Sequence, residues 1–206
     1  MKKIIVALLI ILSQTWLFAA DIPFPPELKW WLSEIQTVDK NAKIENFKIS
    51  EERTLLNFDT PLSYKNRLYP VLKKWNYFGN EFAYYDTLAY LERNKNGKYS
   101  VYGEPESTFG IFDRNETLLF IDFFGSTKGI DSFCWLRDNR IIAVGRDIIN
   151  STEDGLYDVD FIIFDYYIKD GGQIIVKEYS YNIKSKEIKN LKLKWTEQRS
   201  DYFENN

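Results

Sequence analysis

The chain has 206 residues, of which 45% are hydrophobic and 28% charged, as in a folded protein of one domain rather than a disordered one. Its formal net charge of −3, without a basic run, argues against a nucleic-acid-binding protein. The absence of histidine excludes Ser–His and Cys–His catalysis and histidine-ligated zinc.

Residues 1–20 have the layout of a secretory signal peptide. Two lysines precede the apolar run Ile4–Leu12, and Ala19 and Ala20 offer small residues for cleavage. The site is imperfect because cleavage after Ala20 places Phe18 where a small residue is preferred, so an uncleaved anchor stays open as an alternative. We expect a secreted or periplasmic protein, with no membrane insertion after signal cleavage.

The segment Glu27–Val38 is predicted to be a helix, and Pro26 suits its first position. Trp30 lies off the apolar stripe of this helix, so it is the residue that we expect to bind a partner if the helix is exposed. Packing of the helix on a sheet is the alternative. The stripe itself recurs at helical spacing and consists of Leu28, Trp31, Leu32, Ile35 and Val38.

Residues 39–66 are polar and mixed. A short strand is predicted at Lys43–Ile49. A short helix is predicted around Tyr69–Trp75, where Leu68, Leu72 and Trp75 share a face.

From Glu81 onward, apolar runs alternate with turn signals, which is the pattern of β-hairpins. The aromatic content of 17% also favours sheet. Four hairpins are predicted: Phe82–Glu92 with Lys98–Tyr102, Phe109–Phe112 with Thr117–Phe124, Ser132–Leu136 with Arg140–Gly145, and Asp158–Ile168 with Gln173–Ile183.

The run Asp158–Ile168 is apolar on both faces, so it predicts a strand that is covered on each side, with the N-terminal helix as one candidate cover. Ile188–Trp195 alternates apolar residues with lysines, as an edge strand does. The predicted fold is mainly β: an antiparallel meander of hairpins, as a sandwich, a barrel or blade-like sheets, with an N-terminal helix. The predicted parts are a signal peptide at 1–20, a helical and irregular part at 21–80, and a β-hairpin domain at 81–206.

Few residues have a pattern that indicates chemistry. Glu104 and Glu106 flank a proline in a loop, and a carboxylate pair is what glycoside hydrolysis uses. Asp122 and Asp131 flank a loop that contains glycine. The acidic stretch 147–160 has oxygen ligands of the kind that calcium takes, but a solvated turn is the simpler interpretation.

Cys134, the one cysteine, lies in an apolar strand and is expected to be an inert buried thiol. We predict no catalytic residue, metal site or cofactor.

The sequence therefore indicates an exported, non-catalytic binding or interaction protein of the cell envelope or extracellular space. Its expected partner is an envelope or extracellular protein. The alternative is a carbohydrate-binding protein or a carboxylate-dependent glycan hydrolase, with a glycan as partner. A sugar site needs coplanar exposed rings near a carboxylate, whereas a docking surface needs an exposed apolar patch of more than a few hundred Å².

Overall fold

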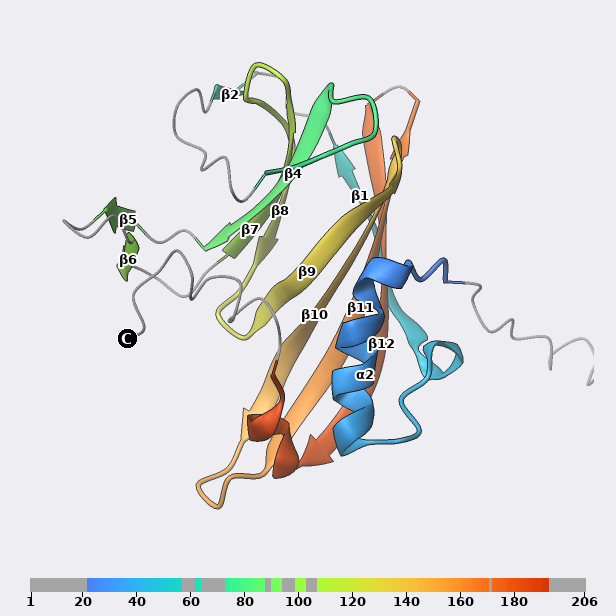
Figure 1. The fold of residues 1–206 in the computed structure, drawn as a ribbon, viewed down its shortest axis with the longest axis vertical. Coiled ribbons are helices and arrows are strands. Elements are labelled where there is room, and N and C mark those ends of the chain that lie inside the picture. The colour runs from blue at the N-terminus through green and yellow to red at the C-terminus, as the bar shows by residue number, and fades with distance from the viewer. Residues whose placement is uncertain are drawn as a thin grey trace, which may run out of the picture.

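A computed structural model describes residues 22–56, 62–63, 73–87, 90–93, 99–102, 107–170 and 172–192. Over these residues the protein consists of two five-stranded antiparallel sheets, a small two-stranded hairpin and one short N-terminal helix (Figure 1). The predicted fold class, mainly β with an N-terminal helix, is confirmed. The predicted signal peptide lies outside the described residues.

The first sheet, called sheet A here, contains the three longest strands of the described chain. Every neighbouring pair in it is antiparallel. Its strand order is β1 (Lys48–Leu56), β12 (Gln173–Ser185), β11 (Tyr157–Lys169), β10 (Arg140–Ser151) and β9 (Lys128–Arg137).

The second sheet, sheet B, is built from shorter strands and follows the order β2 (Leu62–Ser63), β8 (Thr117–Phe124), β7 (Ser107–Asp113), β4 (Glu81–Thr87) and β3 (Lys73–Trp75). The remaining strands, β5 (Tyr90–Arg93) and β6 (Tyr99–Tyr102), pair only with each other.

Three of the four predicted hairpins are confirmed: β7 with β8, β9 with β10, and β11 with β12. The first was predicted as one long strand, Phe82–Glu92, paired with Lys98–Tyr102. In the structure only β5 and β6 pair in this way, whereas β4 pairs with β3 and β7. The reason is burial: Phe82 and Tyr85 lie on opposite faces of β4 and both are buried, which requires an interior strand.

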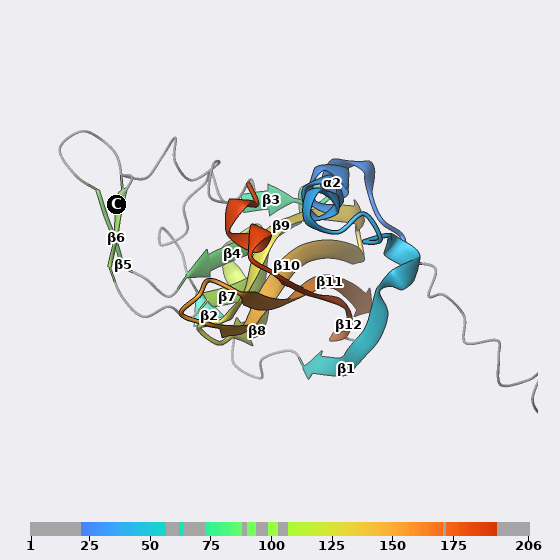
Figure 2. The ribbon, with the colours of Figure 1, turned by 90° about the horizontal axis from the view of Figure 1, so that it is seen from below.

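The N-terminal helix covers one face of sheet A (Figure 2). A 3₁₀ turn, η1 (Pro26–Leu28), leads into α2 (Lys29–Val38), close to the predicted bounds. Trp31 and Ile35 are fully buried against a cluster that includes Phe161 of β11. The rings of Trp31 and Phe161 meet edge to face, with centroids 6.0 Å apart.

The opposite face of β11 packs against sheet B. Phe164 and Tyr166 belong to a second buried cluster that also contains Phe109 and Phe124 of sheet B. The ring of Phe109 lies 4.7 Å from that of Tyr166. The prediction that this strand is covered on both sides, with the helix as one cover, is therefore confirmed.

Three local predictions are wrong. Lys73–Trp75 is not helical but forms strand β3, because Lys74 pairs with Ala83 at the edge of sheet B. Ile188 lies in a 3₁₀ turn, η4 (Glu187–Asn190), rather than in an edge strand, since its side chain is buried in the cluster beneath α2. The predicted strand at Lys43–Ile49 begins with another 3₁₀ turn, η2 (Ile44–Asn46), and extended structure starts only at β1.

One glycine is required where two strands approach closely. A Cβ added at Gly145 would lie 2.0 Å from the backbone oxygen of Gly129, at the register shift between β9 and β10. A side chain at this position would force the two strands apart.

We predict that Phe161→Ala lowers the free energy of unfolding by about 3–5 kcal/mol, because the ring is fully buried between helix and sheet. The control is Phe123→Ala, whose ring is 65% exposed on β8 and whose loss should change stability by no more than about 0.5 kcal/mol. Urea unfolding monitored by tryptophan fluorescence measures both. A loss below about 1 kcal/mol for Phe161→Ala would contradict this packing.

Candidate functional site

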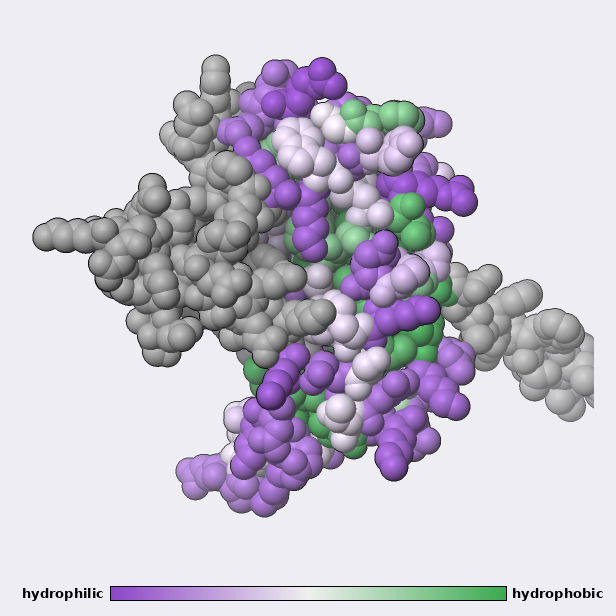
Figure 3. Space-filling view, in the orientation of Figure 1, coloured by the Kyte–Doolittle hydropathy of each residue, from purple (hydrophilic) through white to green (hydrophobic). Residues whose placement is uncertain are grey.

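The turn between β3 and β4, residues 75–80, presents aromatic rings to solvent, and we call it the aromatic turn. Tyr77 is 88% exposed and Phe78 is 70% exposed, while Trp75 at the base is 46% exposed. Pale and green side chains gather over this turn at the upper corner of Figure 3. These rings are not a stacked pair, because the planes of Tyr77 and Phe78 meet at 74° with centroids 5.6 Å apart.

A buried asparagine fixes the shape of the aromatic turn. The amide nitrogen of Asn76 donates to the side-chain oxygen of Asn80 at 2.7 Å, and its amide oxygen accepts from the backbone N–H of Asn80 at 3.2 Å. The Asn76 backbone N–H donates to the Glu81 carbonyl at 2.9 Å. Gly79 has φ of +65°, a conformation that favours glycine. The two exposed rings are therefore held on a closed, hydrogen-bonded loop.

The strand that leads into this turn is also anchored to sheet A. The indole N–H of Trp135 in β9 donates to the Lys74 carbonyl at 2.7 Å. The Lys74 ammonium lies 4.4 Å from the ring centroid of Phe133, and burial lowers the pKa of this amine. These contacts join β3, the edge of sheet B, to β9, the edge of sheet A.

The base of the aromatic turn is acidic. Burial raises the pKa of Glu81, and the nearby charges of Asp138 and Asp113 raise it further. Three carboxyl groups are thus close enough to interact at the base of the turn, where Lys73 of β3 also lies, in an ion pair with Glu116.

The exposed area is large enough to matter. With about 200–250 Å² for a large aromatic side chain, the three residues together expose on the order of 400–500 Å². The largest apolar patch on a typical monomer has about this size and is often functional. The Gly79-Asn80 pair follows an aromatic run, and such a pair is a turn signal in sequence. The predicted helix at Tyr69–Trp75 left this turn unpredicted.

Trp30, the residue singled out for partner binding, lies in the first turn of α2. Its side chain is half-buried and packs against the apolar cluster between helix and sheet A. Its role in binding stays a prediction.

The carboxylate pair proposed for glycan hydrolysis, Glu104 and Glu106, lies outside the described residues. Asp122 and Asp131 are described, but they are not brought together. Asp131 lies on the helix side of sheet A, where its carboxylate accepts from the indole of Trp31 at 3.0 Å and lies 3.5 Å from Arg146. Asp122 lies between the two sheets.

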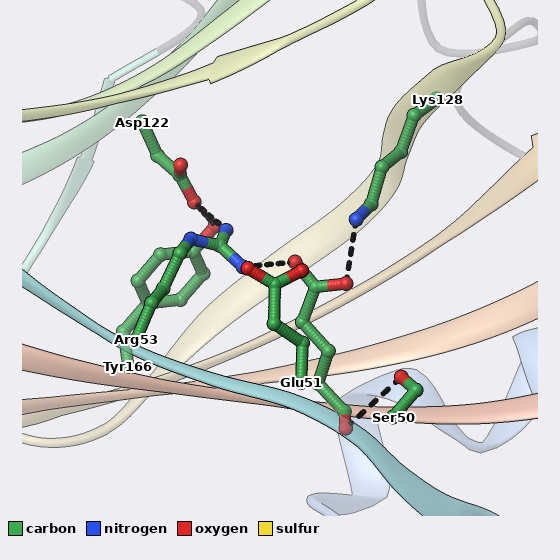
Figure 4. A network of polar contacts seen from close by, with 7 residues as sticks. Ser50, Glu51, Arg53, Asp122, Lys128 and Tyr166 are labelled. Carbon is green, nitrogen blue, oxygen red and sulfur yellow. Dashed lines mark hydrogen bonds and ion pairs between the residues drawn. The ribbon is translucent and has the colours of Figure 1, made fainter.

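Asp122 instead belongs to a charged network in the interior between the two sheets (Figure 4). Arg53 of β1 lies 2.5 Å from the Asp122 carboxylate of β8 and also forms an ion pair with Glu178 of β12. Lys128 of β9 lies 2.5 Å from the second oxygen of Glu178. The hydroxyl of Tyr166 donates to Asp122 at 2.9 Å.

Both carboxylates of this network are occupied by protein groups. Asp122 is 5% exposed and Glu178 is 2% exposed. Burial raises the pKa of Asp122, and the charge of Arg53 opposes that rise. Charges this deeply buried are tolerated only when paired, so the role of Arg53 is structural: it joins β1 to β8 across the interior.

Two further sequence candidates are placed by the structure. In the acidic stretch 147–160, the amide of Asn182 donates to Asp158 and Asp160 at 2.8 Å each, and Lys184 lies 2.8 Å from Asp158. Across the described part of the chain, no three acidic or cysteine residues are grouped so that they could hold a metal ion. Burial raises the pKa of the Cys134 thiol to about 11, so it is protonated at neutral pH.

We predict that Arg53→Met lowers the free energy of unfolding by about 3–5 kcal/mol, because it leaves two buried carboxylates without their shared cation. Arg114→Met, in the exposed β7–β8 turn, is the matched control and should cost no more than about 0.5 kcal/mol. Chemical denaturation at pH 7 compares the two variants. If both behave alike, the network does not hold the sheets together.

Within the described residues no helix has the length and apolar character needed to cross a membrane. Comparisons of the chain with protein-family models, with curated proteins and with solved structures give no match. What the protein does is therefore inferred from its own residues and their geometry.

Proposed function

We propose that the protein is an exported, non-catalytic interaction protein that docks a protein partner of the cell envelope or extracellular space through the aromatic turn, residues 75–80. The observation that carries this proposal is the exposure of Tyr77 and Phe78 on a loop that buried Asn76 holds in one conformation. The proposed export rests on residues 1–20, whose sequence has the layout of a signal peptide.

The energetics of binding favour such an anchor. Exposed Phe and Tyr rings supply a large contact area with only two side-chain torsions each, so little entropy is lost when they are buried. A loop that already has its bound shape avoids the further cost of ordering backbone on binding. Aromatic anchors that fill a pocket on the partner commonly dominate the affinity of an interface.

The surroundings of the turn restrict the partner. Glu81, which follows the turn, lies close enough to Asp113 and Asp138 for their charges to interact. A pocket with apolar walls would bury the exposed rings, and Lys or Arg at its rim would pair with these carboxylates. A protein surface of that kind is the partner that the turn fits.

The glycan alternative is less well supported at this position. A sugar platform would need rings in a common plane, and the planes of Tyr77 and Phe78 meet at 74°. Asp122 and Glu178 are two described carboxylates that lie close together, as a hydrolytic pair would. Both are bound by Arg53 in the interior, so neither is exposed to a substrate.

The proposal is tested in the native host with the full chain. A photo-crosslinking phenylalanine analogue replaces Tyr77, and a second strain carries it at Phe123, which is also exposed but lies toward the far end of sheet B. We expect one protein adduct at position 77 that is absent at position 123. Mass spectrometry then identifies the partner.

The affinity of that purified partner is measured next. The double variant Tyr77→Ser/Phe78→Ser should weaken binding by about 30-fold or more, as loss of an interface hot spot does. Phe123→Ser should leave it within about twofold. An adduct pattern that is the same at both positions, or unchanged affinity of the double variant, would contradict the proposal.

A further inference from the structure

A second surface lies on the helix-side face of sheet A, beyond the region that α2 covers. Side chains of a strand alternate between faces, so residues 159, 161, 163, 165, 167 and 169 of β11 all point to this side. The first three are buried in the cluster that contacts α2. Asp165, Tyr167 and Lys169 instead line a cavity of about 370 Å³. In Figure 1, α2 crosses the lower part of this face, and no described helix crosses the upper part.

The cavity is cationic in a protein that is acidic overall. Arg140, Lys169 and Lys177 line it, against the single lining carboxylate of Asp165, whereas the whole chain has a formal net charge of −3. Glu52 lies outside the lining but forms an exposed ion pair with Lys177 at 3.4 Å. A concave surface with one sign of charge and low-dielectric walls concentrates ligands of the opposite sign. The cavity therefore favours an anion.

The guanidinium at this site is held in place. Arg140 donates through Nε and one Nη to the two oxygens of Asp165, at 2.9 Å and 2.7 Å. Asp165 is only 5% exposed, so this fork is anchored in the floor of the sheet. A guanidinium has five N–H donors and the pair uses two, so Arg140 lines the cavity as an oriented donor.

The remaining walls are flat or apolar. The Tyr167 ring is 41% exposed at the cavity, and Ile175 lies directly opposite it on β12. Tyr179, a member of the cluster that α2 covers, also lines the cavity, and burial raises the pKa of its hydroxyl, which stays protonated. Small-molecule sites combine such apolar walls with a few convergent polar groups, in volumes from roughly 300 Å³ upward.

We propose that this cavity binds a small carboxylic acid that carries a ring. The carboxylate is bound by Lys177 and by the oriented guanidinium of Arg140, and the ring packs on Tyr167. This site is separate from the proposed docking by the aromatic turn, and either proposal can fail without the other. Two sources share the chemistry, an aromatic acid and a uronic acid sugar, and the probes below distinguish them.

The test uses isotope-labelled full chain purified from its native host and titrated in an NMR experiment. Benzoate and glucuronate are the anionic probes, and benzyl alcohol and glucose are their neutral counterparts. We expect shifts confined to the backbone amides around Arg140, Tyr167 and Lys177, saturating with at least one acid and weakening as salt is added. Saturation with benzoate alone identifies an aromatic acid as the ligand class, and with glucuronate alone a sugar acid.

A pair of lysine variants separates site binding from general charge. Lys177→Met keeps most of the side-chain stem and loses only an exposed ion pair with Glu52, at 3.4 Å, so it should fold normally. It should weaken binding of the acid by about tenfold, the effect of one charge-assisted hydrogen bond. Lys189→Met, exposed on η4, is the control and should bind as the parent does.

Ring packing is tested by Tyr167→Ser, which should weaken binding by several-fold with the thermal unfolding temperature nearly unchanged. The proposal is overturned if neither acid shifts these amides, if the neutral counterparts bind equally well, or if Lys177→Met binds like Lys189→Met.

Discussion

The fold depends on one strand, β11, that is buried on both faces. Phe161 and Ile163 need a cover on one side, and Phe164 and Tyr166 need one on the other. The N-terminal helix supplies the first cover and sheet B supplies the second. Both faces of β11 are therefore removed from water only when β7 and β8 of sheet B and a helix more than 100 residues away have all packed against it.

The two covers differ in extent, and that difference creates the candidate sites. A helix of ten residues is too short to cover the 13-residue strand from end to end, so Asp165, Tyr167 and Lys169 line an open cavity. Sheet B is tied to sheet A along both edges, by Arg53 at one and by Lys74 and Trp135 at the other. The second of these ties fixes β3 against β9, and with it the position of the aromatic turn that follows β3.

Much of the fold follows from sequence periodicity, because β11 and the helix stripe each repeat an apolar pattern long enough to identify. Three hairpins follow from turn signals between apolar runs. The short elements did not follow: β3 has three residues and is a strand only because β4 lies beside it, and Ile188 is buried by a distant helix. The candidate sites could not be predicted either, because they too depend on contacts between segments that are distant in sequence. Arg140 and Lys177 belong to different strands, and only the register of β10, β11 and β12 brings them to one cavity. Tyr77 and Phe78 are ordinary aromatics in the sequence, and their exposure depends on the tertiary fold.

The central claim is that the protein carries a preformed aromatic anchor, so the most direct measurement is backbone ¹⁵N relaxation across β3, the aromatic turn and β4. The hydrogen bonds between Asn76 and both Asn80 and Glu81 predict that residues 76–80 are as rigid as the flanking strands, with order parameters of about 0.85. Values below about 0.6 in the turn, with rigid flanking strands, would show a flexible loop and contradict the account.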